Sequence, residues 1–447
     1  MHRQGTLPEL LIPASGLETL KVAVHYGADA VYIGGEAFSL RAKAKNFTKE
    51  EMEEGVSYAH AHGVKVYVTV NILAHNKDLE EAQAYLSFLG ELGPDALLVA
   101  DPGIFRLARR ICPGIPIHIS TQANNVNYET FLFWHALGAE RVVCGRELSL
   151  AEIARIRANI PDSLEIEAFV HGAMCISYSG RCLVSNYLTG RDANRGECTH
   201  PCRWQYRIAP DQSPDRPLPE GAASPSPDTD IMLACAIEEE TRPGERFPVL
   251  ENERGTFLFN SKDLCMIEHI PDMAEAGIDS LKIEGRMKNA LYVATCARTY
   301  RRALDDLAKG RGVYEGHMEW YREQIRDCTF RPFTTGFFYG KPGADAQIYD
   351  SNTYEKTCTY LGCVQDIVEI DGCRYIEIIQ KNKFSVGEEA ELMGKGGEDR
   401  RFVIERILDE EGNPVESAPH PQQKLYVKAA TTAERYDIMR RHDAARL

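Results

Sequence analysis

The chain has no apolar stretch that could cross a membrane and no secretion signal in its first residues. No run approaches the roughly 18 consecutive apolar residues of a membrane-spanning helix. The opening residues, MHRQGTLPELLIPASG, lack a basic segment followed by an apolar one, which is the pattern of a signal peptide. We therefore expect a soluble cytoplasmic protein with no membrane partner.

The chain also lacks a net positive charge: 66 acidic residues outnumber 51 basic ones, and the formal net charge is −15. Such a chain repels a polyanion as a whole, so any contact with RNA must rest on a local basic surface. Two basic segments are candidates, residues 191–207 and residues 298–311. We favour the first, because a basic run such as 298–311 more often forms an ordinary solvated helix face.

Three motifs of common enzyme classes are missing. HExxH and GxSxG do not occur, which argues against a zinc peptidase and a serine hydrolase of the usual kinds. No GxGxxG follows the first expected strand, which weakens a dinucleotide-binding open sheet as the alternative fold.

Eight short apolar runs alternate with amphipathic helical segments, which is typical of a buried parallel sheet. The runs are Leu10–Ala14, Ala30–Gly35, Lys65–Asn71, Ala96–Asp101, Ile115–Thr121, Arg141–Arg146, Glu165–Gly172 and Ser280–Arg286. Eight such units predict an α/β fold of the TIM-like (β/α)8 type.

The expected domains follow from where this repeat is interrupted and where it stops. Residues 1–340 form the barrel, with a cysteine-rich insertion at 173–279 before the last strand. From 341 to 431, short strands separated by turn signals predict a small antiparallel β-barrel. We expect 432–447 to form a helical tail.

Four of the 13 cysteines crowd into the start of this insertion, at Cys175, Cys182, Cys198 and Cys202. The other nine are expected to be buried apolar residues. Four thiolates on one loop can hold zinc or an iron–sulfur cluster, and the spacing leaves both open, along with four reduced cysteines and no metal. Cys235 or Cys265 could replace Cys198 or Cys202 as a ligand.

Polar residues end several of the expected strands, where a barrel of this kind has its active site. Arg146 and Arg286 could bind a dicarboxylate or a phosphate, or could pair with Glu147 or Glu284. His171 ends the seventh strand. We select His171, Glu284, Arg286 and Arg146 as candidate catalytic residues.

Three ordered blocks resemble the collagenase-like peptidase family U32. They are EAFVHGAMCISYSGRCLVS at 167–185, NSKDLC at 260–265 and SLKIEGRMKN at 280–289, and the resemblance covers roughly residues 8–340. Within this family the chain is most similar to the tRNA hydroxylation proteins. That similarity implies formation of 5-hydroxyuridine at the tRNA wobble position, with prephenate as a required metabolite.

The resemblance also implies a 4Fe–4S cluster on Cys175, Cys182 and Cys198, with Cys202 as the fourth ligand, and zinc is the alternative metal. Other family members hydroxylate a cytidine of 23S ribosomal RNA. The rival functions are a U32-type peptidase, for which Cys175 with His171 is the conceivable pair, and a non-catalytic RNA-binding scaffold. A homo-oligomer or a related partner subunit is compatible with the sequence.

Overall fold

The eight expected strands form a closed parallel barrel. The computed structural model describes residues 7–36, 38, 46–175, 177–179, 181–191, 193, 197–203, 235–238, 246–252, 255–257, 261–342, 348 and 355–443. The barrel strands are β1 (Glu9–Pro13), β2 (Ala30–Ile33), β3 (Lys65–Val70), β4 (Ala96–Val99), β5 (Ile117–Ile119), β6 (Arg141–Val143), β7 (Glu165–Ala173) and β12 (Ser280–Ile283). Each pairs with the next, and β12 pairs with both β1 and β7, which closes the ring. The predicted TIM-like fold is confirmed.

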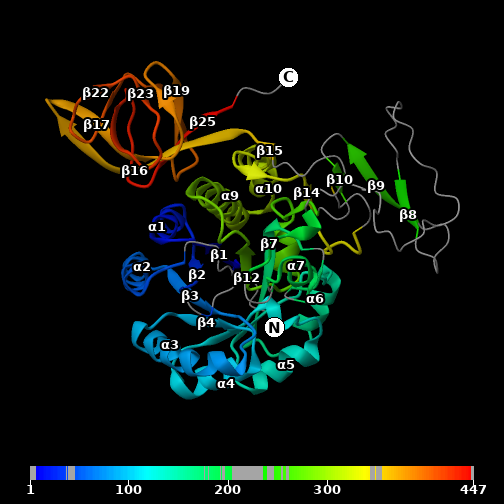
Figure 1. Ribbon diagram of the computed structural model, residues 1–447. Helices are drawn as coiled ribbons and strands as arrows, with labels where there is room; N and C mark the ends of the chain where they lie inside the picture. The colour runs from blue at the N-terminus through cyan, green and yellow to red at the C-terminus, as the bar shows by residue number, and fades with distance from the viewer. Residues whose placement is uncertain are drawn as a thin grey trace, which may run out of the picture.

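Helices surround this ring on its outer side (Figure 1). They are α1 (Leu17–His25), α2 (Lys49–Ala61), α3 (Leu79–Leu92), α4 (Pro102–Ile111), α5 (Tyr128–Ala136), α6 (Leu150–Arg157), α8 (Ile270–Glu275) and α9 (Ala290–Lys309), with short 3-10 turns η1 (Asn76–Asp78) and η2 (Thr121–Ala123). Local sequence fixes several helix starts: Thr48 and Glu51 form a capping box at α2, and Ser149 and Glu152 form one at α6. None of the helices in the described part of the chain combines the length and apolar character needed to cross a membrane.

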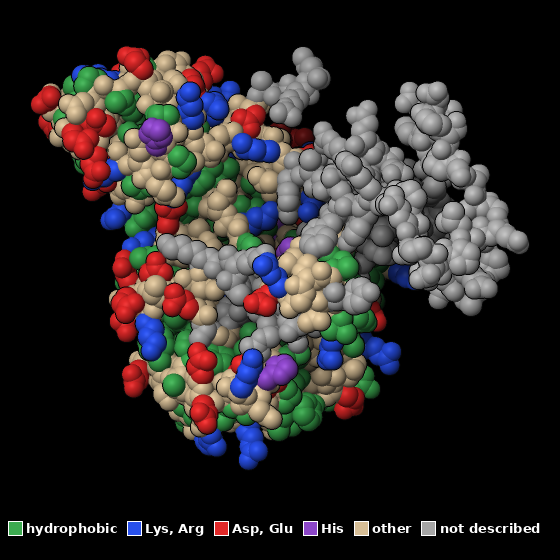
Figure 2. Space-filling model, viewed as in Figure 1, with side chains coloured by type: hydrophobic (Ala, Val, Ile, Leu, Met, Phe, Trp, Pro, Cys, Tyr) green, Lys and Arg blue, Asp and Glu red, His purple; other side chains and the backbone are tan. Residues whose placement is uncertain are grey.

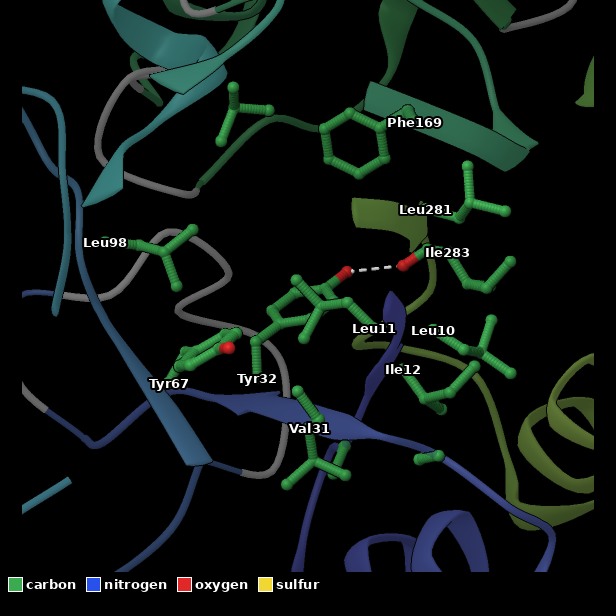
Figure 3. Close-up of a cluster of buried hydrophobic side chains, with 14 of the residues drawn as sticks. Leu10, Leu11, Ile12, Val31, Tyr32, Tyr67, Leu98, Phe169, Leu281 and Ile283 are labelled. Atoms are coloured by element: carbon green, nitrogen blue, oxygen red, sulfur yellow. Dashed lines mark hydrogen bonds between the residues drawn. The ribbon is translucent and has the colours of Figure 1, made fainter. Parts of the chain in front are cut away.

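The barrel interior is filled rather than hollow. Figure 3 shows the side chains of Tyr32, Tyr67, Leu98 and Phe169 gathered within the ring of strands. The Tyr32 hydroxyl donates to the backbone oxygen of Ile283 at 2.8 Å, which ties β2 to β12 across the interior. The space for a ligand is therefore restricted to one end of the barrel.

Charged residues close the opposite end, where the strands begin. Arg141, at the start of β6, contacts Glu9 at 2.6 Å, Glu165 at 2.6 Å and Glu167 at 3.0 Å. The Tyr67 hydroxyl also donates to Glu9, at 2.7 Å. These contacts pair the buried charges, as burial of charge requires.

The insertion leaves the barrel at the end of β7 and returns before β12, as predicted. Its described elements are α7 (Val184–Thr189), the 3-10 turn η4 (Pro201–Arg203), β8 (Cys235–Glu238), β9 (Arg246–Asn252), β10 (Gly255–Phe257) and β11 (Asp263–Cys265). β11 pairs antiparallel with the end of β7, and β14 (Phe333–Thr334) then pairs parallel with β11. The sheet is thus extended on the side where the insertion begins.

The C-terminal region packs against α1 and α9 and forms an antiparallel half-barrel (Figure 1). Two helices, α10 (Arg311–Gly316) and α11 (Met318–Gln324), and the strand pair β13 (Thr329–Phe330) and β15 (Glu355–Lys356) precede it. Its strands are β16 (Cys358–Ile370), β17 (Cys373–Gln380), β19 (Glu389–Met393), β20 (Asp399–Val403), β21 (Arg406–Leu408), β22 (Pro414–Val415), β24 (Lys424–Lys428) and β25 (Ile438–His442), with β18 (Phe384–Ser385) and β23 (Ser417–Ala418) paired separately. The small antiparallel β-barrel that we predicted is therefore present as a half-barrel.

The predicted helical tail at 432–447 is wrong for the part that the structure describes. Residues Ile438–His442 form β25, which lies between β16 and β19 in the half-barrel. The physical reason is tertiary: Ile438 and Met439 are fully buried in this sheet. Packing of these two side chains outweighs the helix propensity of the surrounding residues.

Candidate active site

A pocket opens at the end of the barrel where the strands finish. It contains about 480 Å³ of space, part of it open to solvent. The part of it that admits a water-sized group measures only about 50 Å³, so the pocket is narrow. Its lining comes from five barrel strands, from loops that follow strands and from the insertion: Tyr32, Thr69, Asn71, Leu98, Ser120, Thr121, Gln122, Arg146, Phe169, Ser179, Lys282, Glu284 and Arg286.

Three of the four predicted catalytic residues meet in this pocket. Arg146 donates to the backbone oxygen of Ala173 at 2.6 Å and to the Glu284 carboxylate at 3.1 Å, and it stacks over the Phe169 ring at 4.0 Å. Arg286 is 6% exposed and donates to the Thr69 hydroxyl at 3.1 Å. The ion pair with Glu284, one of the two alternatives for Arg146, is therefore formed, and it lies within the pocket wall.

Lys282 is a pocket residue that we did not predict. It lies in the middle of β12, is 4% exposed and pairs with the buried Glu167 carboxylate at 2.7 Å. Its ammonium also lies 4.5 Å from the Tyr32 ring centroid and 5.5 Å from that of Phe169. Burial lowers the pKa of Lys282, and attraction to Glu167 opposes that shift. A lysine inside the apolar run SLKI was the available signal, since alternate residues of a barrel strand face inward.

The fourth predicted catalytic residue, His171, does not face the pocket. Its ring packs among Tyr292, Tyr300 and Phe333, with centroid distances of 6.0, 5.7 and 5.6 Å. It is 2% exposed, and burial lowers its pKa to about 3. The Tyr300 hydroxyl lies 3.5 Å from its Nδ1 atom. This position beneath α9 gives no support to a catalytic role for His171.

The conceivable peptidase pair of Cys175 and His171 is not formed among the described residues. The Cys175 sulfur lies 3.5 Å from the Ser177 hydroxyl, whereas His171 faces Tyr300 on the other side of the barrel wall. The geometry needed for a base to activate a nucleophile is therefore missing at this position.

The cysteine loop passes over the pocket directly after β7. Ser179, which lies between Cys175 and Cys182 in sequence, lines the pocket. Cys175 is exposed, whereas Cys182, Cys198 and Cys202 are half-buried. The four cysteines that we predicted as ligands are therefore exposed or half-buried, and the loop that carries them begins at the mouth of the barrel.

Hydrogen bonds hold the second half of this loop against α7. The Ser185 hydroxyl, in the first turn of α7, accepts from the Thr199 backbone N–H at 3.1 Å and lies 3.2 Å from the Thr199 hydroxyl. The Thr199 hydroxyl also lies 3.4 Å from that of Thr189. Because α7 starts two residues after Cys182, these bonds bring the segment with Cys198 beside the segment with Cys182.

The arrangement of the four sulfur atoms differs from that of a closed zinc site. Within the described residues, no three of them lie within 4.8 Å of one another. Zinc–sulfur bonds of 2.3 Å would place tetrahedral sulfur ligands about 3.8 Å apart. The backbone N–H of His200 donates to the Cys198 sulfur at 3.4 Å, a contact of the kind that stabilises thiolate ligands of clusters.

Cys265 and Cys235, from later in the insertion, are the alternative cluster ligands. Cys265 lies in β11, opposite His171, with its sulfur 4.0 Å from the Tyr300 hydroxyl, and burial raises its pKa to about 12. Its sulfur faces α9 rather than the cysteine loop. The side chain of Cys235 lies outside the described residues.

Other polar residues near the mouth have local roles. Asp101 caps α4 by accepting from the Ile104 N–H at 2.9 Å. Asn125 accepts from the Trp134 indole at 3.0 Å, and Asn124 donates to the Gln122 backbone oxygen at 2.8 Å. Gln122 itself lines the pocket and is the one of these with access to a ligand.

The basic segment 298–311 is occupied by ion pairs. Its pairs are Arg298 with Asp399, Arg301 with Asp29, Arg302 and Lys309 with Asp306, and Arg311 with Glu275 and Glu315. In the other basic segment, Arg191 is exposed, and residues 204–207 lie outside the described residues. The preference for the cysteine loop as the local basic surface is consistent with these contacts.

Large apolar side chains are exposed around the same loop. Tyr178 is 47% exposed, Leu183 75%, Val184 45% and Leu188 45%. An exposed aromatic ring beside a pocket is the kind of surface on which an unpaired base stacks. The loop therefore offers apolar contacts as well as positive charge.

Comparison with known proteins identifies the family. The sequence profile of peptidase family U32 matches residues 15–348, and that of the peptidase family U32 C-terminal domain matches residues 356–440. The chain belongs to peptidase family U32.

Several relatives of this U32 chain carry names that concern RNA hydroxylation. It is 41% identical over 421 residues to tRNA hydroxylation protein P1 of Bacillus subtilis, covering 94% of this chain and 92% of the relative. It is 40% identical over 428 residues to tRNA hydroxylation protein P of Escherichia coli, covering 92% and 91%. A 23S rRNA 5-hydroxycytidine synthase of Escherichia coli is 33% identical over 347 residues, covering 77% of this chain and 47% of the relative.

Proposed function

We propose that this U32-family chain is a tRNA hydroxylase that forms 5-hydroxyuridine at the wobble position. The similarity to tRNA hydroxylation proteins over more than nine-tenths of the chain supports a tRNA-modifying enzyme. The single structural observation that carries the proposal is the position of Ser179, which brings the cysteine loop into the wall of the basic barrel pocket. A redox centre on that loop would lie beside whatever the pocket binds.

The pocket is suited to a small anion, and we propose prephenate as the co-substrate. Arg146, Arg286 and Lys282 contribute three cationic groups to its wall, whereas Glu284 contributes one carboxylate. Guanidinium groups bind carboxylates through paired hydrogen bonds, and prephenate carries two carboxylates. Tyr32, Leu98 and Phe169 provide the apolar floor on which a carbon ring can rest and from which water is excluded.

The four loop cysteines fit an iron–sulfur cluster. They lie on one loop and are exposed or half-buried, and four thiolates on one loop can hold such a cluster. Cys175, Cys182, Cys198 and Cys202 would hold the cluster, which supplies electron transfer when bound. Tyr178 is then placed to stack the base, while Arg146, Arg286 and Lys282 orient the anionic co-substrate.

The function is tested by nucleoside mass spectrometry of tRNA from a strain that lacks this protein. We expect 5-hydroxyuridine and nucleosides built on it to disappear and to return when the chain is expressed again. Unchanged tRNA nucleosides together with loss of hydroxycytidine from 23S rRNA would reassign the substrate. Unchanged nucleosides in both RNAs would refute hydroxylation.

The cofactors are tested separately. Protein purified without oxygen should contain iron and acid-labile sulfide, and one equivalent of zinc alone would contradict the cluster. Tritium- or carbon-labelled prephenate should bind the wild-type chain, and binding should fall when Arg286 is replaced by Met. Retention of full affinity in that variant would exclude the pocket as the prephenate site.

The family name raises peptidase activity as the rival function, and casein or collagen cleavage provides its test. Cleavage that survives replacement of all four loop cysteines would favour the peptidase. A chain that binds tRNA while its absence leaves every nucleoside unaltered would instead be an RNA-binding scaffold.

A further inference from the structure

A second group of metal-ligand side chains lies far along the chain from the pocket, where the barrel region joins the C-terminal half-barrel. It consists of Asp327, Cys358 and His442, whose ligand atoms all lie within 4.8 Å of one another. Asp327 follows α11, Cys358 begins β16, and His442 ends β25. None of the three lines the pocket, so the proposed hydroxylation does not account for them.

The three ligand atoms are already spaced as a tetrahedral metal would need. The Cys358 sulfur lies 3.2 Å from His442 Nδ1 and 3.7 Å from Asp327 Oδ1, and the last two atoms are 4.0 Å apart. Ordinary zinc bond lengths place such ligand pairs about 3.4–3.6 Å apart. Shifts of about half an ångström would therefore complete the site. Register fixes two of the ligands, since Cys358 and His442 are directly paired across β16 and β25.

The surroundings of the histidine have the form of an outer shell of a metal site. His442 Nε2 lies 3.1 Å from a Glu391 carboxylate oxygen. A ring N–H donated to Glu391 leaves Nδ1 with its lone pair directed at Cys358 and Asp327. Metal-binding histidines almost always donate their second ring nitrogen in this way, because the bond fixes the tautomer and the ring orientation.

The two carboxylate oxygen atoms of Asp327 have different partners, and this fixes the orientation of its side chain. Asp327 Oδ2 is held by Arg440 at 3.2 Å, while Oδ1 faces Cys358 and His442. Arg440 is 1% exposed and also contacts Glu391 at 2.7 Å and Asp399 at 2.9 Å. The charge of Arg440 is therefore still compensated by Glu391 and Asp399 when Asp327 binds a metal ion. A thiolate, a carboxylate and a divalent ion together carry no net charge.

The geometry points to a zinc site formed by Asp327, Cys358 and His442, which fastens the C-terminal half-barrel to the barrel region. The mixed thiolate, imidazole and carboxylate set suits zinc better than magnesium or calcium, which prefer oxygen ligands. The His442 side chain is 41% exposed and provides a path for the ion. Cys358 is 1% exposed, which argues against the alternative that this cysteine and histidine attack a substrate.

Cobalt binding to the full-length chain tests this site. The loop cysteines would bind metal as well, so the background is a chain with Cys175, Cys182, Cys198 and Cys202 all changed to Ser. We expect one equivalent of Co²⁺ to give a thiolate-to-cobalt absorption band that zinc abolishes, and zinc to raise the temperature of unfolding. Absence of the band would overturn the proposal.

Three variants in the same background locate the ion. His442→Gln should remove the band, and Glu391→Gln should weaken affinity about 10–100-fold through loss of the outer-shell carboxylate. Cys373→Ser, which changes a half-buried cysteine at the start of β17, is the matched control and should bind as before. Equal binding by the His442→Gln and Cys373→Ser variants would place the cobalt elsewhere and refute the site. The unfolding temperature of each variant without metal is measured beside that of the background chain, which separates loss of metal binding from misfolding.

Discussion

Buried charge beneath the pocket is concentrated around Arg141. Its guanidinium is 3% exposed and contacts three carboxylates, of which Glu167 is fully buried. Burial alone would raise the pKa of Glu9, but attraction and hydrogen bonding to Arg141 outweigh it and lower that pKa. Through Glu167, this network also reaches Lys282 in the pocket. The residues that support the pocket are therefore held by charge pairs as well as by apolar packing.

Replacing Arg141 by Met should destabilise the protein strongly. Removal of one partner leaves Glu167 and Glu9 with unbalanced buried charge, which costs roughly 3–5 kcal/mol. Chemical denaturation followed by circular dichroism measures this loss. The matched control is Arg155→Met on α6, where the side chain is exposed, and it should unfold like the wild type. Equal stability of the two variants would contradict the role of this network.

At the residue scale, the sequence predicted Arg146, Glu284 and Arg286 correctly as pocket neighbours because each follows a barrel strand. It did not single out Lys282, although a lysine inside the apolar run SLKI was a usable signal, because the expected site residues were the polar residues that follow the strands. Nor did it predict the outward direction of His171, which depends on an irregular register between β7 and β12 near Ile283. The ends of strands can be predicted from the pattern of apolar residues. The direction of a side chain near a register shift depends on how the two strands pair, which the sequence pattern does not show.

At the scale of elements, Asp306 joins α9 to α10 and α11. Its side chain is 1% exposed and accepts from Arg302 at 2.9 Å, Lys309 at 3.0 Å and Tyr321 at 2.8 Å. It also lies 2.8 Å from His317. Burial alone would raise the pKa of Asp306, but hydrogen bonds from Tyr321, Lys309 and His317 outweigh it and hold that pKa well below its ordinary value.

This shift predicts a pH dependence of stability. A carboxyl group whose pKa is lowered by folding stabilises the protein fully above its unfolded value of about 3.9, and the contribution is lost as pH falls towards the folded value. Thermal unfolding from pH 6 to pH 2.5 should therefore show a fall in midpoint below about pH 4 that is smaller in Asp306→Asn. At pH 6 the variant should already unfold at a lower temperature. An unchanged acid profile in the variant would contradict this assignment.

A second element-scale prediction concerns the contact of the cysteine loop with α7. Thr199→Val removes the hydroxyl that lies near Ser185 and Thr189 and should loosen the segment with Cys198. We expect less iron per chain after anaerobic purification, with the overall unfolding temperature little changed. Thr431→Val, a half-buried position in the half-barrel, is the control and should retain wild-type iron. Full iron in the Thr199 variant would show that this contact does not order the ligands.

Elements of the fold differed in how far they could be predicted. The eight barrel strands followed from apolar runs, because strands of a closed parallel sheet are buried on both faces. The conformation of the tail did not follow from its sequence, because residues 432–447 include good helix formers. Only the pairing of Ile438 and Met439 with β16 and β19 makes Ile438–His442 a strand. The half-barrel also remains open on one side, which depends on strand order rather than on local pattern.

For the whole molecule, charge limits where RNA can bind. The net charge is −15, and Figure 2 shows acidic side chains over both the barrel and the C-terminal region on the face in view. Arg298 and Arg301 of α9 are held in ion pairs with carboxylates of other elements, and Arg302 pairs with Asp306 of the same helix. Exposed arginines near the cysteine loop, Arg181 and Arg191, are therefore the better candidates for phosphate contacts.

The double variant Arg181→Gln, Arg191→Gln should bind tRNA more weakly. Loss of two phosphate contacts should reduce the slope of log affinity against log salt concentration by about 1.5–2. Filter binding or fluorescence anisotropy at several salt concentrations measures it. The matched double control is Arg311→Gln, Arg322→Gln, which removes two exposed arginines that are paired with glutamates. Equal slopes for both double variants would exclude the loop as the phosphate contact.

Complementation of a deletion strain tests most directly whether the barrel pocket and the cysteine loop act as one active site. Nucleoside mass spectrometry of the tRNA should show no 5-hydroxyuridine with Lys282→Met or with Cys182→Ser, provided that both variants are present at wild-type levels. Cys373→Ser should restore the nucleoside fully. Restoration by both Lys282→Met and Cys182→Ser would contradict the account.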